Sequence, residues 1–132
     1  MEVKSTLRCL FVAWLVILMT ACASVTQEEF ASADFGDFPQ NYENDIKNYM
    51  SRLLKDPHSA QYSFDTPRKG MSQDGWAVGN KKHFGYIVKT NINAKNSFGG
   101  YTGAKSYYFL FTKGLVTNVS QLYSVGRVKF YE

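Results

Sequence analysis

The chain has 132 residues, a formal net charge of +4 and an aromatic content of 16%. Once a short N-terminal segment is removed, this length suffices for one folded domain and excludes two domains of ordinary size. The high content of Tyr and Phe excludes a disordered polar chain and favours a half-buried β-sheet.

The first 21 residues predict export. Lys4 and Arg8 form a basic start, and the stretch from Leu10 to Met19 is apolar without interruption. This stretch has the length of the apolar region of a signal peptide and falls well short of the roughly 20 residues that a membrane-spanning helix needs. We therefore expect residues 1–21 to be a signal peptide that directs secretion and is then removed.

Cys22 is the expected site of lipidation. The sequence LMTAC, which ends at Cys22, resembles the lipobox of bacterial lipoproteins. The resemblance implies cleavage after residue 21 and acyl chains, such as palmitate, on Cys22, which anchor a protein far more firmly than one chain does. Ala23 stands where an Asp retains many such lipoproteins in the inner membrane, which favours the outer membrane with the domain in the periplasm. An ordinary signal peptide with an incidental cysteine and a single signal anchor are the alternatives.

Residues 22–38 predict a flexible acidic tether. They are mostly small, polar or acidic and show no sustained periodicity. A linker of this kind lets a domain lie at some distance from the bilayer. Phe35 and Phe38 are the exceptions, and their packing on the domain is an alternative that stays open. A single globular domain is expected over residues 39–132.

Residues 39–55 carry the strongest helical pattern. Apolar residues recur at helical spacing from Ile46 to Leu54 with polar residues between them, which predicts an amphipathic helix. Asn41 is placed to cap its start, and Asp56-Pro57 ends it. The apolar stripe is expected to pack on a sheet, and a role in binding a partner is the alternative.

After Pro57 the pattern changes to alternation and to short apolar runs divided by glycine, which predicts strands. The expected strands cover residues 61–64, 76–78, 84–94, 105–112 and 115–123, with an edge strand within 125–131. The strand at 105–112 is expected to be buried on both faces. The fold class predicted is α+β, with one N-terminal amphipathic helix packed on a small meandering antiparallel sheet.

Charge is distributed unevenly along the chain. Residues 22–65 hold eight acidic and three basic side chains, whereas residues 66–132 hold ten basic and two acidic ones. The basic second part suits anionic lipid headgroups, an anionic glycan or an acidic partner protein. Nucleic acid fits the charge equally well, but an exported and tethered protein rarely meets it, so no nucleic-acid partner is expected.

Two segments carry a resemblance to a known family. The segments are Leu54–Tyr62 (LKDPHSAQY) and Asn93–Gly103 (NAKNSFGGYTG). They resemble paired segments of small proteobacterial envelope proteins, many of them predicted lipoproteins, over residues 42–111. Many of those proteins have a cysteine in the strand before the second segment, and residues 86–91 of this chain have none. The resemblance implies a fold and a location in the envelope, and it implies no activity.

The second segment is the candidate binding loop. Its glycines permit positive φ angles and close backbone approach, so it can fold tightly between two strands. Five side chains are then expected to project as a polar and aromatic cluster that binds a sugar or peptide: Lys95, Asn96, Ser97, Tyr101 and Thr102. In the alternative interpretation Asn93 and Asn96 satisfy the loop backbone, and Tyr101 closes the end of the core.

No catalytic, metal or cofactor site is expected. Cys9 and Cys22 are the only cysteines, and processing leaves neither as a free thiol. His58 and His83 have no companion at metal-ligand spacing, and no phosphate-binding loop motif occurs. A hydrolase would need the fold to bring a serine, a histidine and an acid together, so the distance from His83 to the nearest acid is decisive.

The sequence therefore favours a non-catalytic envelope lipoprotein. Its domain is expected to act as a structural or adaptor component that docks onto an envelope protein partner, such as an outer-membrane assembly or a secretion complex. The alternative function is a peptidoglycan- or glycan-binding module that uses the Lys95–Tyr101 loop.

Overall fold

The computed structural model describes residues 26–131. The predicted signal peptide and the predicted lipidation site Cys22 lie outside the described residues. The chain divides into two units, residues 1–31 and 32–132, and the helix α2 (Gln27–Ser32) spans their boundary. No helix among the described residues has the length and hydrophobicity that a membrane crossing requires.

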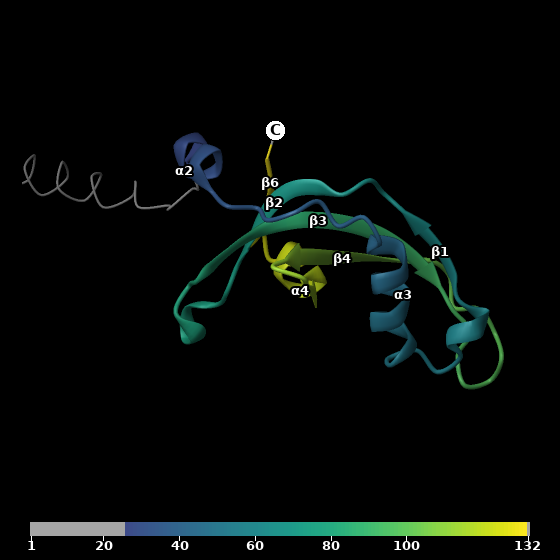
Figure 1. The fold of residues 1–132 in the computed structure, drawn as a ribbon. Helices are drawn as coiled ribbons and strands as arrows, with labels where there is room; N and C mark the ends of the chain where they lie inside the picture. The colour runs from purple at the N-terminus through teal and green to yellow at the C-terminus, as the bar shows by residue number, and fades with distance from the viewer. Residues whose placement is uncertain (1–25, 132) are drawn as a thin grey trace, which may run out of the picture. The chain divides into compact units, whose positions relative to one another are not determined.

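The second unit is an α+β fold built on an antiparallel sheet (Figure 1). Its six strands, in chain order, are β1 (Gln61–Phe64), β2 (Arg68–Gln73), β3 (Lys82–Asn93), β4 (Lys105–Thr112), β5 (Leu115–Asn118) and β6 (Val128–Phe130). The order across the sheet is β5-β4-β3-β2-β6, and β1 also pairs with β3. Strands β2 to β5 follow one another across the sheet as an antiparallel meander.

The long strand β3 organises the sheet. Along one side it pairs with β4. Along the other side it pairs first with β2 and then, near its end, with β1. Between β1 and β2 the backbone N–H of Asp65 donates to the carbonyl of Lys89 at 2.9 Å. The chain therefore leaves β1 and joins β2 along the same edge of β3.

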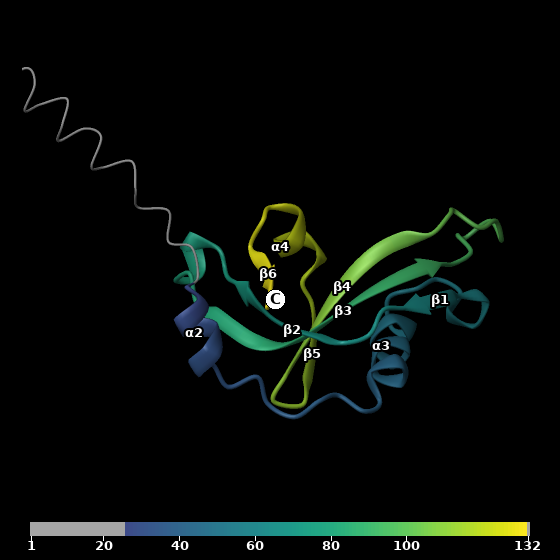
Figure 2. The ribbon, with the colours of Figure 1, turned by 90° about the horizontal axis from the view of Figure 1, so that it is seen from above.

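The helix α3 (Tyr42–Ser51) covers one face of the sheet. It lies within the range 39–55 that the sequence pattern indicates. Its residues Ile46 and Met50 are buried in a cluster with Val88, Ile92 and Phe109, so the apolar stripe faces the core. Figure 2 shows α3 on one side of the β3–β4 hairpin.

The opposite face of β3 and β4 carries a second, smaller cluster. Because side chains alternate between faces along a strand, Ile87 and Leu110 point away from α3 and pack with Val119 and Val128. The short helix α4 (Ser120–Ser124) lies on this side of the hairpin (Figure 2). The two helices therefore flank the same pair of strands.

Three expectations about the strands are wrong. The sequence pattern misses β2 altogether, although β2 is the strand between β3 and β6. The run Trp76–Val78 is the 3-10 turn η3 at the tip of the β2–β3 hairpin. The strand expected over 115–123 ends at Asn118, because the Asn118 side chain accepts from the N–H and hydroxyl of Ser120 at 3.0 and 2.6 Å and the chain turns into α4.

The last part of the expected tether lies against the sheet. The ring of Phe35 packs edge-on against Phe84 with centroids 5.9 Å apart, and Phe38 packs edge-on against Tyr86 at 5.4 Å. The Lys69 ammonium lies 5.1 Å from the centre of the Phe35 ring. Packing of these two rings on the domain was the open alternative for residues 22–38, and in the structure both rings pack there.

Candidate functional site

The predicted binding loop connects β3 to β4 and is held by its own hydrogen bonds. Lys95 and Tyr101 form an isolated β-bridge across it. The side-chain oxygen of Asn96 accepts from the backbone N–H of Phe98 at 2.9 Å and of Gly100 at 3.1 Å. The amide oxygen of Asn96 is thus occupied by the loop, as the alternative interpretation expects. The remaining two predicted residues, Ser97 and Thr102, are exposed.

Tyr101 joins the two segments that carry the family resemblance. Its hydroxyl donates to the carbonyl of Ser59 at 3.1 Å, and the Ser59 hydroxyl accepts from the N–H of Lys95 at 3.2 Å. Ser59 belongs to the 3-10 turn η2 (Pro57–Ser59), whose start Asp56 caps by accepting from the Ser59 N–H at 3.3 Å. Two segments far apart in the sequence therefore form one structural joint.

The exposed surface of this loop carries aromatic as well as polar side chains. Phe98 is 96% exposed at its tip, and Tyr101 is 47% exposed and does not close the core. The Lys95 ammonium lies 5.5 Å from the centre of the Tyr101 ring. Asn93 accepts from the N–H of Gly103 at 3.1 Å, so this amide also serves the backbone. The loop offers two rings, one lysine and the hydroxyls of Ser97 and Thr102 to a ligand.

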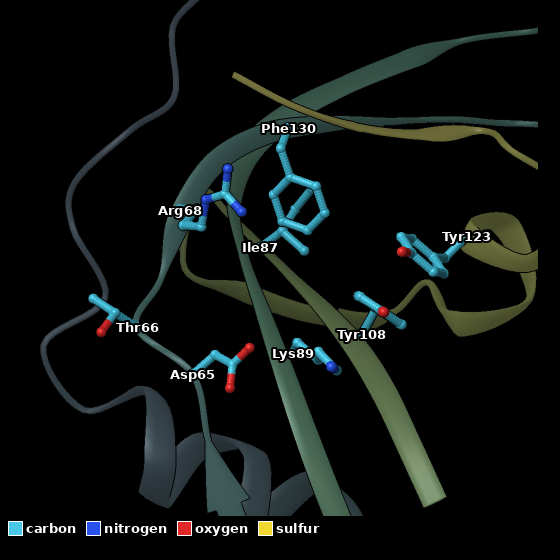
Figure 3. A pocket seen from close by; sticks show the side chains of 8 residues that line it. All are labelled: Asp65, Thr66, Arg68, Ile87, Lys89, Tyr108, Tyr123 and Phe130. Atoms are coloured by element: carbon cyan, nitrogen blue, oxygen red, sulfur yellow. The ribbon is translucent and has the colours of Figure 1, made fainter. Parts of the chain in front are cut away.

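A separate hollow lies on the face of the sheet that α3 leaves uncovered. Its volume is about 250 Å³. Its lining comes from the β1–β2 connection, from β2, β3, β4 and β6, and from α4 (Figure 3): Asp65, Thr66, Arg68, Ile87, Lys89, Tyr108, Tyr123 and Phe130. We call this space the α4-side hollow. Its residues are distant in sequence, so only the fold assembles them.

Cationic and aromatic groups dominate the α4-side hollow. Arg68 and Lys89 supply two positive charges against one carboxylate, Asp65. The Arg68 guanidinium lies 4.7 Å from the centre of the Phe130 ring, which is within the range of a cation–π contact. Buried Ile87 forms an apolar part of the lining. An acidic group with an adjoining planar or apolar part matches this arrangement.

Two stacked tyrosines form one wall of the hollow. The rings of Tyr108 and Tyr123 are 3.6 Å apart between centroids and inclined by 16°. Burial is the main cause that raises the pKa of Tyr108 to about 12, and a hydrogen bond with Tyr123 and the charges of Tyr123 and Asp65 add to it. The Tyr108 phenol therefore keeps its proton at neutral pH and acts as a neutral hydrogen-bond donor or acceptor.

His83 lies next to an acid. Its Nε2 is 3.0 Å from Oδ2 of Asp74, and the register of β2 and β3 places Ser72 opposite His83. A nucleophilic serine must reach a substrate carbonyl, but Ser72 is only 2% exposed. The sheet thus places a serine opposite the histidine that contacts Asp74, but this serine is buried. Within residues 26–131 no group of three or more His, Cys, Asp or Glu side chains is placed to hold a metal ion.

Comparison with known proteins identifies no relative of this chain. No family model matches the chain, and no curated protein or solved structure is similar to it.

The sequence interpretation missed the α4-side hollow. Its two basic residues, Arg68 and Lys89, fall in the basic second part of the chain, which is the one signal that pointed towards this region. Arg68 lies on the strand that the pattern did not reveal, and Tyr123 lies on a helix expected as strand. Without those two elements, no spacing in the sequence brings the eight residues together.

Proposed function

We propose that this protein is a lipid-anchored bacterial envelope protein that acts without catalysis as an adaptor. Cys22 carries the lipid, in the outer membrane, and the domain faces the periplasm. The domain binds an acidic group of an envelope protein partner in the α4-side hollow. The observation that carries this proposal is the convergence of Arg68, Lys89 and three aromatic rings from separate elements on one open face.

The charge arrangement supports binding in preference to internal ion pairing. Arg68 is exposed and Lys89 is partly buried, and the single acid of the lining, Asp65, is exposed at the rim. One carboxylate does not neutralise two cations, so an anionic group of a partner gains favourable electrostatic interactions there. The aromatic walls add contact area of the kind that enriches binding interfaces. The resemblance of the two segments to envelope proteins agrees with the location.

The anchor is tested by metabolic labelling with an alkyne fatty acid in cells that express the full chain. The expected result is a labelled protein in the membrane fraction, with the label absent from Cys22→Ser. A wild-type protein without label, or an equally labelled Cys22→Ser, would remove the anchor from the proposal. Neither result bears on whether the hollow binds a partner.

The adaptor role is tested by placing a photo-crosslinking amino acid at Thr66, on the rim of the hollow, in living cells. Leu53, which is 61% exposed at the end of α3, is the control position. The expected result is one discrete adduct from Thr66 that Leu53 does not give and that Arg68→Glu abolishes. The adaptor proposal fails if no adduct forms, or if both positions give the same adducts.

The second candidate is a peptidoglycan- or glycan-binding module at the Lys95–Tyr101 loop. The observation that favours it is the exposed pair of rings, Phe98 and Tyr101, since sugars stack on such rings. Binding to isolated sacculi separates the two functions. The glycan function predicts loss of binding in Tyr101→Ala and its retention in Tyr101→Phe, which keeps the ring. Equal or absent binding in all three proteins would exclude it.

A further inference from the structure

The tip of the β2–β3 hairpin presents large apolar side chains to solvent. Trp76 is 81% exposed and Val78 is 69% exposed, and both belong to the single turn η3. Tryptophan is usually highly buried because its ring is large and apolar. Side chains of this size at the end of a hairpin therefore require an explanation that the sheet and the α4-side hollow do not supply.

The backbone beneath Trp76 is held by several hydrogen bonds. The Asp74 N–H donates to the Lys81 carbonyl at 2.9 Å, which closes the hairpin. The Arg127 guanidinium donates to the Asp74 carbonyl at 2.6 Å and to the Asn80 side chain at 3.2 Å, and Gln73 donates to the Asn80 carbonyl at 3.1 Å. The exposure of Trp76 and Val78 is thus a property of an ordered turn.

Basic side chains adjoin this turn. Lys81 and Lys82 follow it after Gly79 and Asn80. Together with Lys113 they line a hollow of about 400 Å³ that also includes Leu115, which is exposed. Asp34 is the only acidic side chain of that lining. At this end of β3, an apolar turn therefore lies next to a surface on which basic side chains outnumber acidic ones.

We propose that the η3 turn inserts Trp76 and Val78 into the interface of a lipid bilayer that contains anionic headgroups. Tryptophan prefers the level of the headgroups because its ring is apolar and its N–H is polar. Lysines next to it are attracted by the negative surface potential of such a bilayer. The favoured partner is a membrane, because the lysines complement the headgroups while the ring and Val78 lie at the boundary between the headgroups and the acyl chains. This inference does not depend on lipid at Cys22.

The test uses the full chain with Trp14→Phe. The chain has two tryptophans, so Trp76 is then the only one whether or not the N-terminal segment is removed. The probe is a vesicle of phosphatidylcholine and phosphatidylglycerol, prepared with or without brominated acyl chains. The expected result is a shift of the tryptophan emission to shorter wavelength and its quenching by the bromines. A chain that is anchored only at its N-terminus binds the same vesicles without quenching of Trp76.

Two matched variants sharpen the result. In Trp14→Phe/Trp76→Phe/Leu53→Trp, the reporter moves to an exposed position in the turn after α3 and should not be quenched. Lys81→Glu should weaken quenching on the anionic vesicles, whereas Lys105→Glu, an exposed lysine at the other end of the sheet, should leave it unchanged. The inference is overturned if Trp76 stays unquenched on bound protein, which would instead leave the turn to a protein partner. It is also overturned if the Leu53 position is quenched equally.

Discussion

The two faces of the β3–β4 hairpin differ in what they enclose. Towards α3, Phe109 and its neighbours are buried among aliphatic and aromatic side chains. Towards α4, Tyr108 stands beside Lys89, and a hollow remains open. Tyr108 and Phe109 are adjacent in sequence, and successive side chains of a strand point to opposite faces of the sheet. One strand therefore contributes both to a face that stabilises the fold and to a face that keeps charged groups available. The comparison predicts that stability and binding respond to different substitutions.

The largest expected effect is on the α3 face. Phe109→Ala removes a fully buried ring that packs edge-on against Tyr49 with centroids 5.7 Å apart. Loss of such a ring typically costs about 3–5 kcal/mol of unfolding free energy. Urea unfolding measures this loss of free energy. The control is Leu115→Ala, which changes an exposed side chain and should alter the unfolding free energy by less than about 0.5 kcal/mol. Equal losses in the two variants would contradict the proposed core.

The second largest loss of stability is expected at a close backbone contact inside the sheet. A Cβ at Gly85 would lie 2.1 Å from the carbonyl oxygen of Phe111, so Gly85→Ala forces two strands apart. We expect a loss of about 1–3 kcal/mol, the usual range for overpacking. Gly75→Ala is the control, because nothing lies within 4 Å of its Cβ. If Gly85→Ala unfolds at the same urea concentration as the control, the β3–β4 register is wrong.

Thr90 is the one residue of the α3 face whose change should raise stability. Its hydroxyl is buried and has no hydrogen-bond partner among the described residues. Thr90→Val keeps the shape and removes the desolvated hydroxyl, which should be neutral or gain about 1 kcal/mol. The urea midpoint of this variant, compared with that of wild type, measures the change in stability. A loss of more than about 1 kcal/mol would reveal a partner that the hydroxyl uses.

The α4 face gives an effect on stability that appears only at high pH. Because the folded state raises the pKa of Tyr108 from 10.0 to about 12, this residue stabilises the fold below pH 10, and that contribution is lost as the pH rises through 12. The titration of Tyr108 is measured as the difference in tyrosinate absorbance between wild type and Tyr108→Phe as the pH is raised. In Tyr123→Phe the midpoint should fall towards 10, since the hydrogen bond and charge of Tyr123 are absent. An unchanged midpoint would leave burial and the charge of Asp65 as the causes.

The sequence predicted those elements of the fold whose stabilising contacts follow a short-range pattern. The helix over 39–55 and the strands Gln61–Phe64 and Lys105–Thr112 carry their periodicity in their own residues. Strand β2 does not, because it contains Arg68, Lys69 and Gly70 and is stabilised by pairing with β3 and β6. A Cβ at Gly70 would lie 2.6 Å from the Lys129 carbonyl, so the glycine permits a close approach that only the assembled sheet requires.

The site was predicted only in part for the same reason. The loop residues are contiguous, so the sequence located them, but it left open whether Asn96 would face a ligand or serve the loop backbone, as it does in the structure. The α4-side hollow depends on the β2 register and on the turn at Asn118, which are set by contacts distant in sequence. The exposure of Trp76 was not predicted, because the short apolar run Trp76–Val78 between two glycines has the pattern of a strand and forms a turn in the structure.

The central claim, that one face folds the domain and the other binds a partner, is tested most directly by one double variant. Arg68→Glu/Lys89→Glu reverses both cations of the α4-side hollow without touching the α3 cluster. Its urea midpoint and its photo-crosslinking from Thr66 in cells would be measured together. The account predicts an unfolding free energy within about 1 kcal/mol of wild type and loss of the adduct. An adduct that persists, or one that is lost together with the fold, would contradict it.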